Sequence, residues 1–526
     1  MLDLRIVGGS IVDGLGAEPF SGDIGITGDT ITAIGDLSHA AARLTIDLAN
    51  DGQGASSRIV CPGFIDVHSH SDTHILIEPS SPSKVHQGIT TEVLGNCGTS
   101  AAPRLGQYRV SEEWRKRAYP GQWRTVADYR ALLDQVAPAP NVVLLIGHGN
   151  LRAAVAGYGS GPLDAADTEK MVRLLEEALD QGGRGLSSGL IYPPGMFAGH
   201  EELAALAAAA ARRDGVYATH MRSEGDRLLE SVEETLSVGR DAGVRVEISH
   251  LKAHGSDNWG MLERVLDTIS KARKEGVAVA ADRYPYTSGW TTLDIVLPAW
   301  FHDGGNEAAM SRLGNASERA KARKELLDAG DGRDWADITV GSTHSPETRR
   351  FQGTPLLDVA HQLGMDPVDA VLHLVEHDRL ATGAFFESMD PRNMRRILRE
   401  PYVMLGSDAS LRAPEGPFSE DFPHPRAYGA FPRFLRMVLD EGLVPLPEAV
   451  RKMTSLPADH FRLTGRGVLR EGNKADIVVF NPGQVRDIAT FVQPHKLAQG
   501  IEYVIVNGVL TLERGKLTGR RAGRIL

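Results

Sequence analysis

The stretch 59–72, IVCPGFIDVHSHSD, ends an apolar run with two histidines, His68 and His70, that are two residues apart. Side chains two apart on a β-strand point to the same face, so we expect both imidazoles to project from one side of a buried strand. A buried pair of this kind is either a packed core pair or half of a metal site, because neutral imidazole is the commonest side-chain metal ligand. The acidic Asp66 and Asp72 nearby favour the metal site.

Composition excludes several classes of function. The chain has 526 residues, a net charge of −11 and no basic cluster, which argues against a nucleic-acid partner. It has no run of about 18 apolar residues, so we expect no membrane span. Two cysteines and the absence of a signal-like N-terminus indicate a cytoplasmic protein. No feature indicates an oligomeric state.

Both ends of the chain show short strand-like runs separated by glycine and aspartate turns. We expect residues 1–57 and 470–526 to build one small β domain together. The expected strands are 4–7, 10–12, 23–26, 31–34, 44–47, 475–480, 501–506, 509–512 and 516–518.

Between these ends, apolar strand-like runs alternate with helical stretches such as 169–181, 201–214 and 261–275. This alternation is typical of a parallel sheet with crossover helices, and eight such units predict a (β/α)8 barrel over residues 58–469. The eight expected strands are 59–70, 90–98, 141–150, 184–191, 216–222, 244–252, 277–286 and 402–408.

Residues 299–350 interrupt this rhythm. They are charged, and they contain one helical stretch at 318–329 and one strand-like piece at 337–342. We interpret them as an insertion between barrel strands 7 and 8. The insertion is either a lid over the site or a solvent-exposed excursion without a catalytic role.

In a (β/α)8 barrel the chemistry lies at the C-terminal ends of the strands. Ligand-type side chains stand at the expected ends of strands 1, 2, 5 and 6, and an aspartate follows strand 8. A mixture of imidazole and thiolate favours zinc over magnesium or calcium. The residues are His68 and His70, Cys97, His220, His250 and Asp408.

Several long motifs of this chain resemble those of a known protein family. They are PGFIDVHSHSD, VLGNCGTSAAP, GLSSGLIYPPG, THMRSEGD, ISHLKAHG, DRYPY, GSDAS and HPRAYGAFPRFL. Together they make the chain similar, nearly end to end, to the D-aminoacylase (N-acyl-D-amino-acid deacylase) family of the amidohydrolase superfamily. The resemblance implies a TIM-like barrel with a small β-sandwich built from both termini. It also implies hydrolysis of N-acyl-D-amino acids, and the D preference comes from it alone.

The resemblance implies roles for the strand-end residues. Cys97, His220 and His250 would bind one tight zinc ion, and His68 and His70 would border or complete a second, weaker metal position. The fourth strand, GLSSGLIYPPG, offers no lysine for the carboxylated bridge of many amidohydrolases, which leaves the choice between one and two metals open.

Amide hydrolysis needs an activated water, and zinc lowers the pKa of a bound water to about 7. Asp408 would take the proton from that water and pass it to the departing amine. A substrate with a free carboxylate also needs a cationic clamp. The family resemblance implies Lys252, Tyr192, Tyr284 and Arg426 for this clamp, with a surface salt bridge as the alternative for Arg426 and barrel packing as the alternative for Tyr284.

The preferred substrate side chain is a separate question. The loop 287–300 after strand 7 carries no arginine or lysine, which favours neutral or apolar side chains over acidic ones. The alternative reactions are hydrolysis of cyclic amides, such as hydantoins or lactams, and of dipeptides with a D residue. A non-catalytic scaffold is the alternative class, but it would not retain every metal ligand and Asp408.

Overall fold

The computed structural model describes residues 1–49, 58–110, 112–115, 117–328 and 334–526. Its centre is a parallel sheet of eight strands in the spatial order β16-β12-β11-β10-β9-β8-β7-β6. Just beyond the two outer strands, Ser69 after β6 forms a parallel bridge with Ala409 after β16, and this bridge brings the two edges of the sheet together into a barrel. The predicted (β/α)8 barrel is therefore confirmed. Its strands are β6 (Phe64–Asp66), β7 (Ile89–Leu94), β8 (Asn141–Gly147), β9 (Gly185–Gly189), β10 (Val216–His220), β11 (Arg245–Ile248), β12 (Val279–Arg283) and β16 (Val403–Leu405).

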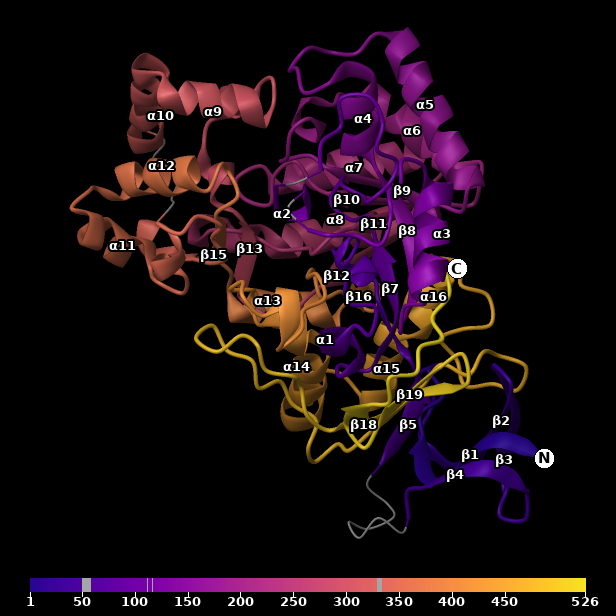
Figure 1. Ribbon diagram of the computed structural model, residues 1–526. Coiled ribbons are helices and arrows are strands. Elements are labelled where there is room, and N and C mark those ends of the chain that lie inside the picture. Colours follow the sequence, from indigo (N-terminus) through magenta and orange to yellow (C-terminus); the bar gives the residue numbers. More distant parts are fainter. Residues whose placement is uncertain (50–57, 111, 116, 329–333) are drawn as a thin grey trace.

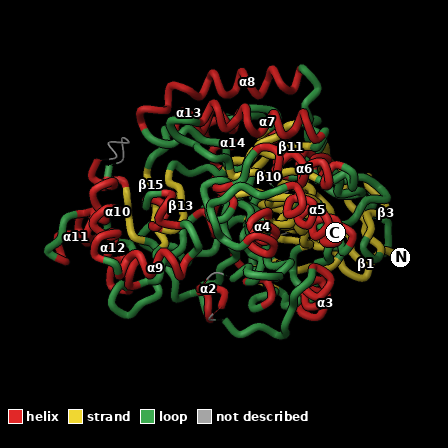
Figure 2. The backbone as a smooth tube through the Cα atoms, turned by 90° about the horizontal axis from the view of Figure 1, so that it is seen from above, coloured by secondary structure: helices red, strands yellow, loops and turns green. Residues whose placement is uncertain are grey.

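Helices connect the strands and cover the outside of the barrel (Figure 1, Figure 2). The three helices predicted at 169–181, 201–214 and 261–275 are α5, α6 and α8. None of the described helices is both long enough and apolar enough to cross a bilayer. The barrel helices are α1 (Pro82–Val85), α2 (Glu112–Arg115), α3 (Val126–Val136), α4 (His148–Ala156), α5 (Ala165–Asp180), α6 (His200–Ala211), α7 (Leu228–Ala242), α8 (Leu262–Lys274), α13 (Pro391–Arg399), α14 (Arg426–Glu441), α15 (Leu446–Met453) and α16 (Ser455–His460).

Alternation along the strands separates two cores. On β8, Val143 and Leu145 belong to the small cluster inside the barrel, whereas Val142 and Leu144 belong to the large cluster between the sheet and its helices. The interior cluster also includes Phe461, directly after α16. The carbonyl of His460, which precedes it, accepts a hydrogen bond from Arg245 at the start of β11. The N-terminal end of the barrel is therefore filled, which leaves the opposite end for chemistry.

The two ends of the chain form one sheet beside the barrel (Figure 1, lower right). The sheet follows the order β20-β19-β18-β17-β5-β1-β2-β3, and β4 pairs with β1. The predicted boundary at residue 57 lies outside the described residues, and the division into domains stays a prediction. The strands are β1 (Leu2–Ile11), β2 (Phe20–Thr27), β3 (Thr30–Gly35), β4 (Ala42–Asp47), β5 (Ile59–Pro62), β17 (Ile477–Phe480), β18 (Ile501–Val506), β19 (Val509–Glu513) and β20 (Lys516–Leu517).

One expected strand is divided in the structure. Residues 59–70 were expected to form the first barrel strand, but β5 pairs with β1 and β17 in the terminal sheet. Only the three residues of β6 pair with β7 in the barrel. Gly63 separates the two strands, and a Cβ at this position would lie 2.1 Å from the Thr90 hydroxyl oxygen. The change of sheet therefore occurs where the absence of a side chain permits close packing.

The insertion between β12 and β16 spans more residues than the predicted 299–350. It contains an antiparallel sheet of three strands in the order β13-β15-β14, with its own apolar core (Figure 1, upper left). The predicted helix at 318–329 corresponds to α10, although Ala329 lies outside the described residues. A role as a lid stays a prediction. The elements are β13 (Ser288–Thr292), α9 (Asn306–Gly314), α10 (Ala316–Asp328), β14 (Ile338–Val340), α11 (Leu356–Leu363), α12 (Pro367–His377) and β15 (Gly383–Glu387).

The packing at the N-terminal end of the barrel predicts how a core substitution there changes stability. Phe461→Ala should lower the free energy of unfolding by about 3–5 kcal/mol, because it leaves a cavity in the interior core. Urea unfolding followed by tryptophan fluorescence measures this loss, and Phe20→Ala at an exposed position of β2 is the control. An equal midpoint for Phe461→Ala and the unmodified protein would contradict the assigned packing.

Candidate metal centre and substrate pocket

Three of the predicted ligands converge at the C-terminal end of the barrel. Cys97 follows β7, His220 is the last residue of β10, and His250 follows β11. One donor atom from each lies within 4.8 Å of the other two, and all three residues are buried. The Cys97 Sγ atom is 3.6 Å from His250 Nε2. One thiolate and two imidazoles fit the nitrogen and sulfur ligands that zinc prefers.

His68, His70 and Asp408 border this group. Both histidines follow β6 instead of lying within it, so they are placed by the closing bridge at Ser69 and not by a regular strand. His68 Nε2 is 3.2 Å from Cys97 Sγ, and His70 Nε2 is 3.1 Å from Asp408 Oδ1. His68, His250 and Asp408 form a further group with donor atoms within 4.8 Å. The structure therefore offers a second position for a metal that shares side chains with the first.

The backbone is strained at three of these residues. Cys97, His250 and Asp408 have φ values of 53°, 37° and 50°, in the left-handed region that favours glycine. Strained residues of this kind cluster at functional sites, where the surrounding structure holds them. Before Cys97, Gly95 has a φ of 79°, and a Cβ there would lie 2.1 Å from the Leu145 carbonyl oxygen. The tight turn that inserts Cys97 therefore requires this glycine.

One buried and one partly buried carboxylate orient the histidines. Asp282 of β12 lies 3.1 Å from His68 Nδ1, and Glu224 lies 2.8 Å from His250 Nδ1. A carboxylate on the far ring nitrogen fixes the tautomer of a metal-binding histidine and strengthens it as a ligand. Sequence reasoning assigned no role to either. The available signals were the place of Asp282 at a strand end and the acidic residue within THMRSEGD.

Charge around the centre favours ionised ligands. Burial alone would raise the pKa of the Cys97 thiol, but His68, His220 and His250 outweigh it and hold this pKa well below its usual value. Burial likewise opposes ionisation of Asp408, whereas Arg426, His68 and His250 hold its pKa well below the ordinary range. The surroundings therefore favour the thiolate form of Cys97 and keep Asp408 a carboxylate near neutral pH.

The predicted substrate-binding residues lie beside this centre. The Lys252 ammonium contacts Glu224 and lies 6.0 Å from the centre of the Tyr284 ring. The Arg426 guanidinium lies 4.4 Å from the same ring and bonds to Asp408 at 2.9 Å, so in this arrangement it is not a surface salt bridge. The Tyr192 hydroxyl meets the Thr291 hydroxyl of β13 at 3.0 Å. The ring of Tyr192 also lies 5.1 Å from that of His220, so all four predicted residues are close to the metal centre.

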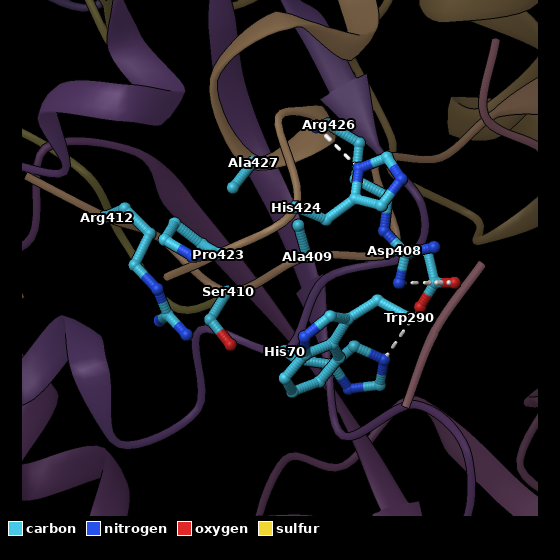
Figure 3. Close-up of a pocket in the computed structure, with 10 residues that line it drawn as sticks. All are labelled: His70, Trp290, Asp408, Ala409, Ser410, Arg412, Pro423, His424, Arg426 and Ala427. Atoms are coloured by element: carbon cyan, nitrogen blue, oxygen red, sulfur yellow. Dashed lines mark hydrogen bonds and ion pairs between the residues drawn. The ribbon is translucent and has the colours of Figure 1, made fainter. Parts of the chain in front are cut away.

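A small pocket opens beside Asp408 (Figure 3). Its two arginines are both paired with carboxylates. Arg426 contacts Asp408, and Arg412 Nε lies 2.6 Å from Asp421. The pocket is lined by His70, Trp290, Asp408, Ala409, Ser410, Arg412, Pro423, His424, Arg426 and Ala427.

Other polar residues at the strand ends do not join the centre. His148 is the first residue of α4, and its Nε2 lies 2.7 Å from Glu202. Arg222 forms an ion pair of 2.9 Å with Glu234. These residues have structural partners of their own. The five residues of β9, GLSSG, contain no lysine, in agreement with the absence noted from the sequence.

Comparison with known proteins places this geometry in a family. The model of the amidohydrolase family named Amidohydro_3 matches residues 54–512. The N-acyl-D-glutamate deacylase of Alcaligenes xylosoxydans xylosoxydans is 37% identical over 526 residues, covering 100% of this chain and 96% of that protein. The D-aminoacylase of the same organism is 36% identical, with coverages of 100% and 97%.

A solved structure agrees with these sequence matches. The N-acyl-D-glutamate deacylase of Bordetella bronchiseptica, complexed with zinc and a phosphonate inhibitor, superposes with a TM-score of 0.83 at 36% identity. The superposition covers 100% of this chain and 99% of that one. The chain belongs to the amidohydrolase family.

Proposed function

We propose that this protein is a zinc-dependent hydrolase of N-acyl-D-amino acids, which releases a carboxylate and a free D-amino acid. One observation carries the proposal. A buried thiolate and two imidazoles lie within 4.8 Å of one another beside an ionised aspartate. They do so in a chain that is similar over its full length to N-acyl-D-amino-acid deacylases.

Cys97, His220 and His250 would hold the tight zinc ion. When bound, zinc supplies a Lewis acid that activates water and polarises the substrate carbonyl. His68 and His70 would border a second and weaker position, which shares Cys97 with the first because the donor atoms of His68, His70 and Cys97 also lie within 4.8 Å of one another. This sharing supports one strongly occupied metal site rather than two equal ones.

Asp408 would move the proton. Its carboxylate accepts the proton of the attacking water and then donates it to the departing nitrogen, which is otherwise a poor leaving group. Arg426, at 2.9 Å, keeps this carboxylate ionised and oriented before the substrate arrives. His70, at 3.1 Å, fixes its other oxygen.

The substrate carboxylate needs donors that are already in place. The charged groups of Lys252 and Arg426 approach the Tyr284 ring. Glu224 forms an ion pair with Lys252, and Asp408 forms one with Arg426. Burial alone would raise the pKa of the Tyr284 phenol, but Lys252, Arg283 and Arg426 together lower it. The positive potential that these groups create at the Tyr284 phenol supports binding of an anion by Lys252, Tyr284 and Arg426, with Tyr192 as a further hydroxyl donor.

The pocket supports a neutral substrate side chain. Arg412 is neutralised by Asp421, and Arg426 by Asp408, so neither offers an uncompensated charge to a second carboxylate. Burial and the nearby Arg426 hold the pKa of His424 well below its usual value, so this imidazole is neutral. Trp290 and Pro423 add apolar surface. We therefore expect apolar D-amino acids to be preferred over D-glutamate and D-aspartate.

A substrate panel tests the reaction. We expect the zinc-loaded enzyme to release amine from N-acetyl-D-leucine and N-acetyl-D-methionine, more slowly from N-acetyl-D-glutamate, and not from the L enantiomers. Amine release is measured at equal substrate concentrations. Turnover of the L series, or no turnover of any N-acetyl-D-amino acid with zinc bound, would contradict the proposed function.

Cys97→Ala should lose the tightly bound zinc, because the only sulfur ligand of the proposed set is removed. Zinc content after dialysis against a weak chelator is the measurement. Cys61→Ala is the matched control, since Cys61 is a buried core thiol of β5. A full equivalent of zinc in Cys97→Ala would remove Cys97 from the ligand set.

Asp408→Asn should fold and retain zinc but lose turnover by about 100- to 10,000-fold, the usual contribution of a general acid and base. The kcat of the zinc-replete variant is the measurement. A kcat close to that of the unmodified enzyme would show that another group moves the proton.

A further inference from the structure

A network of charges is buried behind the seam between β6 and β16. Its members are Lys84 of α1, Asp66 of β6 and Glu92 of β7, and the side chain of each is fully buried. The Lys84 ammonium donates to Asp66 at 2.7 Å and lies 3.4 Å from Glu92. Burying charges is costly even when they are paired. The proposed reaction assigns no task to these groups, so their presence calls for another explanation.

The network holds the residues on both sides of Asp408. The Asp66 carboxylate accepts hydrogen bonds from the Ser407 backbone N–H at 2.8 Å and from its hydroxyl at 2.6 Å. The Lys84 ammonium donates to the Ala409 carbonyl at 2.8 Å and to the Ser407 hydroxyl at 2.9 Å. The aspartate is therefore fixed through its two neighbours.

The same network holds the residue between the two histidines. The Ser69 hydroxyl donates to Glu92 at 2.6 Å and lies 3.3 Å from the Lys84 ammonium. Ser69 stands between His68 and His70 in the chain. One ammonium group thus connects the histidine pair on one side of the seam with Asp408 on the other.

We propose that Lys84 and Asp66 are positioning residues, which hold the carboxylate of Asp408 in register with the metal centre. The proposal rests on the proposed role of Asp408. That residue has a φ of 50°, and such a conformation persists only where the surroundings impose it. The bonds to Ser407 and Ala409 supply this constraint.

The contacts of Lys84 also predict which part of the catalytic centre is disturbed when its ammonium group is removed. Lys84 contacts the residues on either side of Asp408. The tight metal ligands belong to other strands, since Cys97 follows β7, His220 ends β10 and His250 follows β11. Loss of the ammonium should therefore displace the proton-transferring carboxylate without removing the tight metal ligands. Misplacement of a reacting group by about 1 Å costs about 100-fold in rate.

Lys84→Met tests the proposal in the full-length, zinc-loaded enzyme. We expect kcat for N-acetyl-D-leucine to fall about 100-fold, with one equivalent of zinc retained and KM little changed. Asp476→Asn is the matched control, because it breaks the buried pair with Arg466 on the side of the terminal sheet. The control should lower the unfolding temperature but leave kcat unchanged.

Wild-type kcat in a folded, zinc-replete Lys84→Met would overturn the proposal, as would an equal loss of kcat in the control. Should Lys84→Met fail to fold, Ser407→Ala takes its place, since it removes only the hydroxyl that meets Lys84 and Asp66. A fall in kcat at constant KM supports the proposal, and an unchanged kcat overturns it.

A crystal structure of the variant separates this proposal from the proposed reaction. In Lys84→Met the 3.1 Å contact between His70 Nε2 and Asp408 Oδ1 should be lost, whatever the substrate proves to be. An unchanged contact overturns the positioning role. Absence of turnover by the unmodified enzyme on the whole panel would instead contradict the proposed function.

Discussion

The closure of the barrel between β6 and β16 is the constraint on which the centre depends. These two strands come from opposite ends of the catalytic region, and they meet through the bridge between Ser69 and Ala409. On either side of that bridge lie the two groups that chemistry needs near each other, the His68–His70 pair and Asp408. A seam that shifted by one residue would separate them, because the side-chain direction alternates along a strand. The buried charges of Lys84 and Asp66 act at this seam, where the register matters most.

The centre combines strain with electrostatic compensation. Three of its residues adopt a left-handed backbone conformation, and two positively charged side chains near it, Lys252 and Arg426, have carboxylate partners. Arg426 with Asp408 and Lys252 with Glu224 remain balanced in the absence of substrate. A substrate carboxylate then meets donors that are already ordered, which reduces the entropy lost on binding. The carboxylates that hold His68 and His250 extend this preorganisation to the proposed metal ligands.

The sequence predicted the barrel because eight apolar runs, each followed by a helical pattern, leave few other arrangements. It also predicted which strand ends carry ligand-type residues, and the structure brings these together. It did not predict that residues 59–70 change sheets at Gly63, because an uninterrupted apolar run does not reveal a change of pairing partner. Nor did it assign roles to Glu224, Asp282 or Lys84. Their roles arise from contacts between elements distant in the chain, whereas a single acidic or basic residue carries no signal of its partner. The insertion extends beyond the predicted residues 299–350 because its strands β13 and β15 lie within stretches whose sequence resembles ordinary connecting loops.

The proposed reaction requires that a thiolate and two imidazoles, Cys97, His220 and His250, bind zinc where Asp408 can serve the reaction. X-ray absorption spectroscopy at the zinc edge, on the enzyme loaded with one equivalent of metal, identifies the atoms that bind the metal. We expect one sulfur neighbour at about 2.3 Å together with nitrogen or oxygen neighbours at about 2.0–2.1 Å. A first shell of nitrogen and oxygen alone would contradict it, because the metal would then lie away from Cys97.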